Sequence, residues 1–281
     1  MKKLILFIIT FSLLWLTGCS ENSTDSGKKT IAVSIAPEAT FVKAVCGEKF
    51  NIITAIPTGA SPETYEPTPA EMQKITNAEI YFAIGVPAEE NSILPLIDRE
   101  KTVVLQDFVA KEYPELSDGE HRDPHIWLSP KRVMVMVEKI AETLKNHDPE
   151  NADFYSANAK NYILELEKLN EYIVTAFKDL KNRNFLVFHP AFSYFADDYS
   201  LSMHALEEHG KETTAKRLAE MTDLAKEKHI KTIFYQAEAS NKTAVSFAEE
   251  IGGTAVMLEP LSPDYIENIK KMTDLLQKAM K

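Results

Sequence analysis

Four short segments of this chain each carry a histidine or a glutamate beside an apolar, strand-like run. They are residues 59–63 (GASPE), 123–130 (DPHIWLSP), 188–190 (FHP) and 258–260 (LEP), and their candidate ligands are Glu63, His125, His189 and Glu259. Neutral imidazole nitrogen suits zinc, manganese and iron ions, and a carboxylate oxygen compensates the charge of a divalent ion. Two histidines and two glutamates in such positions predict one metal-binding pocket built from loops.

Each candidate also has an interpretation without metal. Glu63 could be a solvated loop carboxylate beside Tyr65 and Glu66. His125 and His189 could each bond a backbone carbonyl, and His125 could cap the helix that Pro130 can start. Glu259 is harder to explain without a partner, because carboxylates are rarely buried unpaired. The remaining histidines are weaker candidates, although one of them, His121, could assist metal capture from its polar loop; they are His121, His147, His204, His209 and His229.

The elements that must position these residues alternate between strands and helices. Apolar runs predict strands at residues 30–36, 51–56, 80–84, 102–105, 185–188, 231–235 and 254–258. Helical patterns cover residues 41–45, 70–77, 130–146, 191–199, 214–228, 241–251 and 263–280. Near-continuous apolar strands that alternate with helices predict an α/β fold with parallel sheets covered on both faces.

A much longer helix is predicted over residues 151–180, where apolar residues keep a helical period without Gly or Pro. At about 1.5 Å per residue it exceeds 40 Å, which is too long for a crossover inside one small lobe. We therefore expect two α/β lobes bridged by this helix, with the metal site in the cleft between them. Ligands bind outside the carboxyl ends of such strands. Two histidines and two carboxylates can close a four-ligand site, which favours binding over catalysis.

The N-terminus has the pattern of a secretory signal, with Lys2 and Lys3 before an uncharged apolar stretch that ends near Gly18. Cys19 at that point resembles a bacterial lipobox, which predicts a lipid-modified N-terminus anchored to a bacterial membrane. We expect a signal peptide at 1–18, a flexible tether at 19–29, an N-terminal lobe at 30–150, the linking helix at 151–181 and a C-terminal lobe at 182–281.

Composition narrows the function further. The formal net charge is −11, and an acidic chain argues against nucleic-acid binding. Apart from Cys19 the chain has one cysteine, Cys46, which we expect to be a small buried hydrophobe. No second apolar stretch is long enough to cross a membrane, so the predicted membrane contact is the lipid anchor alone.

Together, residues 59–69 (GASPETYEPTP), 123–130, 188–195 (FHPAFSYF) and 258–261 resemble the ZnuA/TroA-like metal-binding lipoproteins of bacterial ABC importers. The resemblance covers essentially the whole mature chain. It implies two α/β lobes, one bridging helix and a divalent metal between the lobes. It implies ligands at His125, at His189 and at a carboxylate that matches Glu259. The fourth ligand is normally histidine at the position where this chain has Glu63.

The resemblance also implies the partners and the location. The chain would be an extracytoplasmic, lipid-anchored, monomeric receptor that delivers its ion to an ABC permease with a separate ATPase subunit. It contains no G-x-x-x-x-G-K-[ST] motif of its own. The motifs around His125 and His189 resemble those of the zinc-binding members of the family, which favours Zn²⁺. Replacement of a histidine by Glu63 makes the ligand set harder, which keeps Mn²⁺ or Fe²⁺ as the alternative.

Two other classes of function remain open from the sequence. A secreted metallohydrolase could use a His/Glu metal site with one bound water, although the chain has neither H-E-x-x-H nor G-x-S-x-G. An adhesin could use a metal ion only for its structure. For the receptor, the long helix predicts small lobe or loop shifts rather than wide hinge closure.

Overall fold

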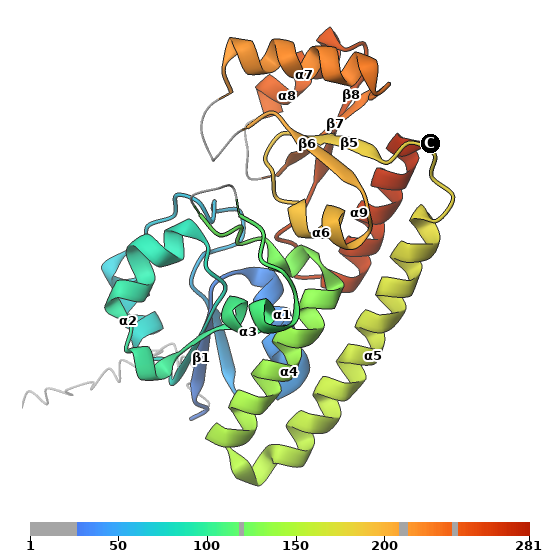
Figure 1. The fold of residues 1–281 in the computed structure, drawn as a ribbon. Helices are drawn as coiled ribbons and strands as arrows, with labels where there is room; N and C mark the ends of the chain where they lie inside the picture. Colours follow the sequence, from blue (N-terminus) through green and yellow to red (C-terminus); the bar gives the residue numbers. More distant parts are fainter. Residues whose placement is uncertain (1–26, 118–120, 208–212, 238–240) are drawn as a thin grey trace, which may run out of the picture.

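The computed structural model describes residues 27–117, 121–207, 213–237 and 241–281. The predicted signal peptide, the lipidation residue Cys19 and most of the predicted tether lie outside the described residues. The described chain forms two lobes, one below the other in Figure 1, with long helices running along one side of both. This arrangement confirms the predicted fold class.

The N-terminal lobe is built on a four-stranded parallel sheet with the strand order β2-β1-β3-β4. Its strands are β1 (Thr30–Val33), β2 (Asn51–Thr54), β3 (Ile80–Ala83) and β4 (Thr102–Val104). The helices that connect and follow them are α1 (Ala36–Cys46), α2 (Pro69–Thr76) and α3 (Leu105–Glu112). The inner strands β1 and β3 are buried almost throughout, as expected for a parallel sheet covered on both faces.

The C-terminal lobe repeats this plan with the strand order β6-β5-β7-β8. Its strands are β5 (Asn184–Val187), β6 (Ser202–Ala205), β7 (Thr232–Gln236) and β8 (Thr254–Leu258). The helices between them are α6 (Ser193–Asp198), α7 (Ala215–Glu227) and α8 (Asn241–Glu250). In both sheets the first strand of the lobe lies between the second and the third, so the two halves share one topology. Hydrophobic periodicity alone does not reveal that relationship.

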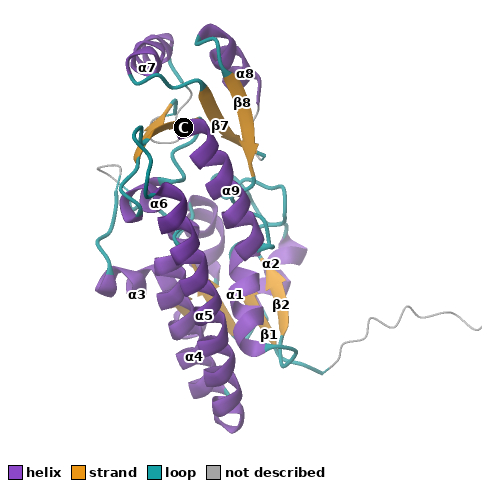
Figure 2. Ribbon diagram, turned by 90° about the vertical axis from the view of Figure 1, so that its right-hand side faces the viewer, coloured by secondary structure: helices purple, strands orange, loops and turns teal. Residues whose placement is uncertain are grey.

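The bridging element is α5 (Ala152–Phe177), a 26-residue helix about 39 Å long at 1.5 Å per residue. It lies beside α4 (Pro130–His147) in the N-terminal half and beside α9 (Tyr265–Met280) in the C-terminal half (Figures 1 and 2). Its buried residues recur every three to four positions, which gives one continuous apolar face; they are Tyr155, Ala159, Tyr162, Leu166, Leu169, Ile173 and Phe177.

Several elements differ from the sequence prediction: α1 begins at Ala36 rather than at residue 41, and α3 was not predicted. The strand predicted at residues 102–105 ends at Val104, because Leu105 already begins α3. The edge strand β6 was not predicted, since its residues are mostly polar or half-exposed and include Ser202 and His204. It is also very short. An edge strand of this kind has no apolar run by which the sequence could mark it.

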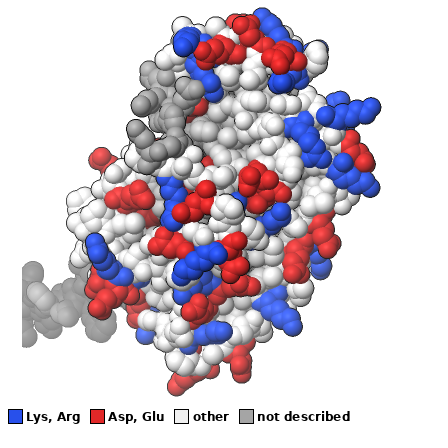
Figure 3. Space-filling model, viewed as in Figure 1, with Lys and Arg blue, Asp and Glu red and all other residues white. Residues whose placement is uncertain are grey.

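The largest hydrophobic cluster is continuous between the lobes. It extends from the sheet of the N-terminal lobe through α4, α5 and α9 to β5 and α6, and it includes the fully buried Cys46. A smaller cluster lies in the C-terminal lobe between its sheet and the helices α7 and α8. In the described chain no helix has both the length and the apolar character needed to cross a bilayer. Acidic and basic side chains are interspersed over the face drawn in Figure 3.

Candidate metal centre

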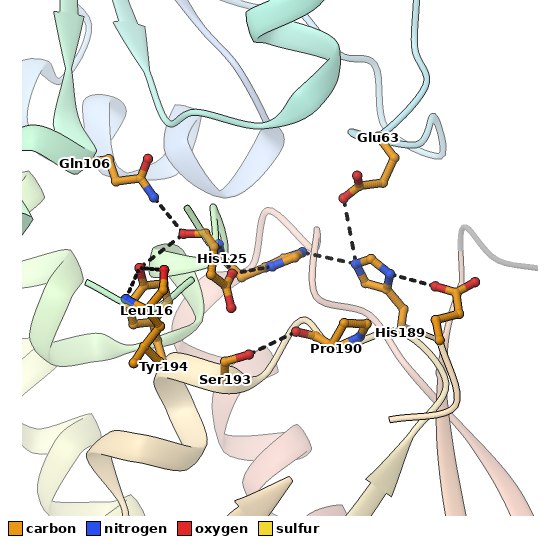
Figure 4. Close-up of polar contacts among 10 residues, drawn as sticks. Glu63, Gln106, Leu116, His125, His189, Pro190, Ser193 and Tyr194 are labelled. Carbon is orange, nitrogen blue, oxygen red and sulfur yellow. Dashed lines mark hydrogen bonds and ion pairs between the residues drawn. The ribbon is translucent and has the colours of Figure 1, made fainter. Parts of the chain in front are cut away.

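Three of the four predicted ligands converge between the lobes. Glu63, His125 and His189 each offer one ligand atom, and these three atoms lie within 4.8 Å of one another. Glu63 and His125 come from the N-terminal lobe and His189 from the C-terminal lobe (Figure 4). Glu63 and His189 lie 126 positions apart in the chain (189 − 63), and the packing of the two lobes brings them together.

The loop after β2 carries Glu63. Gly59 has a φ of +87°, in the left-handed region that favours glycine, and it lies in a turn closed by the bond from the Ala60 N–H to the Pro57 carbonyl at 3.0 Å. The Ser61 hydroxyl accepts a hydrogen bond from the Glu63 N–H at 3.2 Å. The Ala88 N–H donates to the Pro62 carbonyl at 2.9 Å and ties this loop to the segment that follows β3. The Glu63 carboxylate therefore projects from a backbone that is held on both sides.

His125 precedes a short 3-10 turn, η4 (Ile126–Leu128), and lies almost fully buried. The Asp123 carboxylate accepts from the His125 N–H at 2.9 Å and lies 2.7 Å from the imidazole Nδ1. Burial alone would raise the pKa of Asp123, but the charge and hydrogen bonds of His125 outweigh burial and lower it. Asp123 is thus a carboxylate, which can only accept a hydrogen bond, so Nδ1 of His125 carries the proton.

His189 follows β5, the strand at which the order of the C-terminal sheet reverses, and this is where ligands bind in open α/β sheets. Glu207, in the loop that follows β6, lies 2.8 Å from Nδ1 of His189. Each imidazole therefore has a carboxylate at its Nδ1 and presents its Nε2 to the centre of the site. A carboxylate in this position sets the tautomer and the ring orientation of a metal-binding histidine.

The two Nε2 atoms lie 3.3 Å apart, and Nε2 of His189 is 3.7 Å from the Glu63 carboxylate. Two Nε2 lone pairs that face each other at this distance repel unless a proton or a metal cation lies between them. The Glu63 carboxylate adds the negative charge that a divalent cation requires there. The arrangement is therefore suited to binding a divalent metal ion.

A cavity of about 210 Å³ opens on these donor atoms. Glu63, His125 and His189 line it together with Glu207 and Gln236. A second cavity, of about 380 Å³, adjoins the same three donors on the side of His121 and Asp123. An ion can thus reach the donors from the cleft, although both histidine side chains are only about one-tenth exposed.

The structure does not bring Glu259 to this group. Its carboxylate pairs with Lys271 at 2.9 Å, and the two side chains are 44% and 62% exposed. The next residues along the chain, Pro260 and Leu261, line the smaller cavity instead. The sequence prediction that Glu259 is a ligand therefore stays a prediction, and the geometry does not support it.

The two carboxylates that hold the imidazoles were not predicted from the sequence. Asp123 lies in the quoted motif two residues before His125, and that spacing was the available signal. Glu207 had no such signal, because it lies 18 residues from His189 and follows the strand β6 that was not predicted. The indole of Trp127 was also missed; it donates from Nε1 to the carbonyl of Pro260 at 3.0 Å and joins the two lobes.

Two α/β lobes on a long helix, with histidines from both lobes converging in the cleft, define the class of metal-binding solute receptors. The chain belongs to the ZnuA family, described as the periplasmic component A of a zinc-uptake complex, and matches it over residues 31–279. This confirms the resemblance noted from the sequence and the expectation of a binding protein rather than an enzyme.

Relatives and solved structures agree with this membership. The chain is 30% identical over 278 residues to the zinc-binding lipoprotein AdcA of Streptococcus pneumoniae, an alignment that covers 93% of this chain and 56% of AdcA. It thus spans about half the length of that relative. It is 29% identical to the high-affinity zinc uptake protein ZnuA of Bacillus subtilis, with 98% and 97% covered. A crystal structure of a ZnuA superposes with a TM-score of 0.84 at 32% identity, covering 90% of this chain and 100% of that one.

Proposed function

We propose that this chain captures a divalent metal ion, zinc in the first place, outside the cytoplasm. Its protein ligands are His125, His189 and Glu63. The observation that carries the proposal is the convergence of two imidazole Nε2 atoms and one carboxylate within 4.8 Å, from both lobes. Relatives that are named as zinc-binding or zinc-uptake proteins support zinc as the cargo.

The spacing of the donors supports zinc as well. Zn–N bonds of about 2.05 Å in a tetrahedral site separate two ligand nitrogens by about 3.3 Å. The Nε2 atoms of His125 and His189 have that separation, 3.3 Å. Manganese or iron is the alternative cargo, because two nitrogens and one carboxylate oxygen form a harder donor set than three histidines.

We further propose that the ion is passed to an ABC permease served by a separate ATPase subunit, with the receptor acting as a monomer. Cys19 would carry the lipid that anchors the receptor to the membrane. Stable anchoring takes two acyl chains, each contributing about 0.8 kcal/mol per buried methylene. In that case a full-length Cys19→Ser chain would leave the detergent phase for the aqueous phase on Triton X-114 partition. Equal partition of both chains would reject the anchor.

The cargo is tested by titrating the purified, metal-stripped protein with zinc in a calorimeter. We expect one ion per chain for the parent. His125→Ala and His189→Ala should each lose at least about tenfold in affinity, because even loss of an outer partner of a metal site costs about 10–100-fold.

His147→Ala is the matched control. That imidazole pairs with Glu79 at 2.6 Å, away from the cleft, so its loss should leave zinc affinity unchanged. Parent-like affinity in both cleft variants would remove histidine ligation and the proposed function with it.

A further inference from the structure

Helix α6 of the C-terminal lobe touches the segment of the N-terminal lobe that leads to His125 (Figure 4). The phenol oxygen of Tyr194 accepts a hydrogen bond from the Leu116 N–H at 3.1 Å. The same hydroxyl lies 3.2 Å from the Asp123 carbonyl and 3.4 Å from the Leu116 carbonyl, and it can donate to either. The Tyr194 side chain of the C-terminal lobe therefore contacts two residues of the N-terminal lobe, Leu116 and Asp123.

The backbones of Leu116 and Asp123 are also hydrogen-bonded to each other. The Asp123 N–H donates to the Leu116 carbonyl at 2.9 Å. From the side of the N-terminal lobe, the Gln106 amide donates to the Asp123 carbonyl at 2.6 Å. The backbone of Asp123 is thus held by two contacts from its own lobe, with Leu116 and Gln106, and by the Tyr194 hydroxyl from the other lobe.

The position of Asp123 decides the orientation of His125. Its carboxylate engages both the backbone N–H and the ring Nδ1 of His125, at 2.9 and 2.7 Å. A shift of Asp123 would release the ring and free its Nδ1 proton to move to Nε2. A protonated Nε2 cannot bind a metal ion.

We propose that Tyr194 is a positioning residue for metal binding, which holds the ligand His125 of the opposite lobe in place through Asp123. The inference rests on the proposed function. Tyr194 lies five residues after His189, and the Ser193 hydroxyl donates to the carbonyl of Pro190 at 3.2 Å. One short segment therefore supplies one ligand and positions the other, so that movement of α6 disturbs both imidazoles together.

The ring and the hydroxyl of Tyr194 have different contacts, so a substitution can remove the hydroxyl contacts and keep those of the ring. The side chain is 1% exposed, and its ring packs 4.4 Å from the guanidinium of the buried Arg132. Burial raises the pKa of the Tyr194 phenol, which keeps the hydroxyl protonated and able to donate. Tyr194→Phe keeps the ring against Arg132 and removes only the contacts to Leu116 and Asp123.

Tyr199→Phe is the matched control. Tyr199 immediately follows α6, is also buried, and donates its hydroxyl to the Asn170 side chain at 2.9 Å on α5. Both variants lose one hydrogen-bonded phenol hydroxyl, but only Tyr194→Phe releases the Asp123 segment. A purely structural role would make the two variants behave alike.

The first readout is the rate at which zinc leaves the full-length protein when a chelator is added. We expect release to be about 10–100-fold faster in Tyr194→Phe, as for other outer partners of metal sites, and unchanged in Tyr199→Phe. Release at the parent rate in Tyr194→Phe, or equal acceleration in both variants, would overturn the proposal.

The second readout needs no metal. In the apo parent, ¹⁵N spectra of the imidazoles should show His125 with its proton on Nδ1, and Tyr194→Phe should shift His125 toward a mixture of tautomers. An unchanged His125 spectrum overturns the proposal even if the parent binds zinc. Conversely, a parent that fails to bind zinc rejects the proposed function, while this spectrum still decides the role of Tyr194.

If Tyr194→Phe does not fold, hydrogen exchange in the parent shows whether the contact between Tyr194 and Leu116 forms in solution. The Leu116 N–H has Tyr194 as its hydrogen-bond partner. Exchange at least tenfold slower than for an unprotected amide supports the contact. Exchange at the unprotected rate shows that the contact does not form in solution and overturns the proposal.

Discussion

The two histidines of the cleft share one local design. Each has a carboxylate within 2.8 Å of its Nδ1, Asp123 for His125 and Glu207 for His189. The ring nitrogen that remains is the one that faces the other lobe. Orientation by an outer carboxylate also makes an imidazole a stronger ligand. The site is thus prepared for a cation by residues that do not touch the ion.

The two predicted glutamate ligands are distinguished by their surroundings. Zinc titrations should show Glu63→Ala at least about tenfold weaker than the parent, because Glu63 supplies the carboxylate oxygen of the converging group. Glu259→Ala should bind like the parent, since its carboxylate is engaged with Lys271 in an exposed pair. Exposed pairs contribute about 0–1 kcal/mol to stability, so this variant should also fold normally.

A loss of zinc affinity in Glu259→Ala would change the assignment of the ligands. If Glu259→Ala lost as much affinity as Glu63→Ala, Glu259 would have to reach the ion in the loaded state, as the family resemblance implied. Glu63→His provides a third comparison, because it places the family's usual histidine at this position. We expect it to keep zinc binding.

At the scale of elements, a buried acidic pair joins the strands beneath the site. The Glu38 carboxylate of α1 accepts from the Ser34 N–H at 2.7 Å, and the Ser34 hydroxyl donates to Glu89. Glu89 also accepts from the N–H groups of Ile84 and Gly85 at 3.1 and 2.6 Å, just after β3. The pair thus ties the carboxyl ends of β1 and β3 together, next to the loop of Glu63.

Both carboxyls have raised pKa values in the folded protein. Burial is the main cause at Glu38, followed by the charge of Glu89. At Glu89 burial outweighs the hydrogen bonds from Ser34 and Gly85 that act in the opposite direction. The folded protein therefore holds protons that the unfolded chain releases above about pH 4.3.

This pair should make the protein less stable as pH rises. Its contribution is complete below about pH 4.3 and is lost as pH rises through the folded pKa, by up to about 1.4 kcal/mol per pH unit for each proton. Urea unfolding at pH 5 and pH 8 should therefore show a smaller loss of unfolding free energy for Glu38→Gln than for the parent.

Glu138→Gln, at an exposed position of α4, is the control and should follow the parent. If the three proteins lose the same unfolding free energy between pH 5 and pH 8, then Glu38 does not hold its proton in the folded state.

At the scale of the whole molecule, several contacts fasten the lobes to each other. The Trp127 indole donates to the Pro260 carbonyl at 3.0 Å, and the Thr40 hydroxyl donates to the Pro263 carbonyl at 2.6 Å. Both contacts join the N-terminal lobe to the loop after β8. The helix α5 and the continuous hydrophobic cluster add a rigid connection along one side.

Metal binding should therefore leave the overall shape almost unchanged. We expect small-angle X-ray scattering to give the same radius of gyration, within experimental error, for the metal-stripped and the zinc-loaded protein. Closure of a wide hinge would instead reduce this radius on loading. A reproducible reduction would show that the contacts of Trp127 and Thr40 do not hold the lobes together in solution.

The sequence by itself determined what depends on local pattern. Uninterrupted apolar periodicity predicted α5 to within a few residues at each end, because a helix of that length needs one continuous buried face. Buried parallel strands were predicted as apolar runs, whereas the four-residue edge strand β6, which alternates polar and apolar residues, was not. His125 and His189 were selected because histidines next to such elements lie where ligands bind.

The tertiary structure alone decided which of these residues meet. Glu207 lies 18 residues from His189 and reaches it because β5 pairs with β6, whereas His125 lies 64 residues away and reaches it only because the two lobes pack together. The hydrophobic periodicity of the sequence does not predict that packing, because the packing depends on distances between elements and not on the order of residues within them. For the same reason Glu259, at the end of its strand, could be predicted as a candidate but not placed beside Lys271.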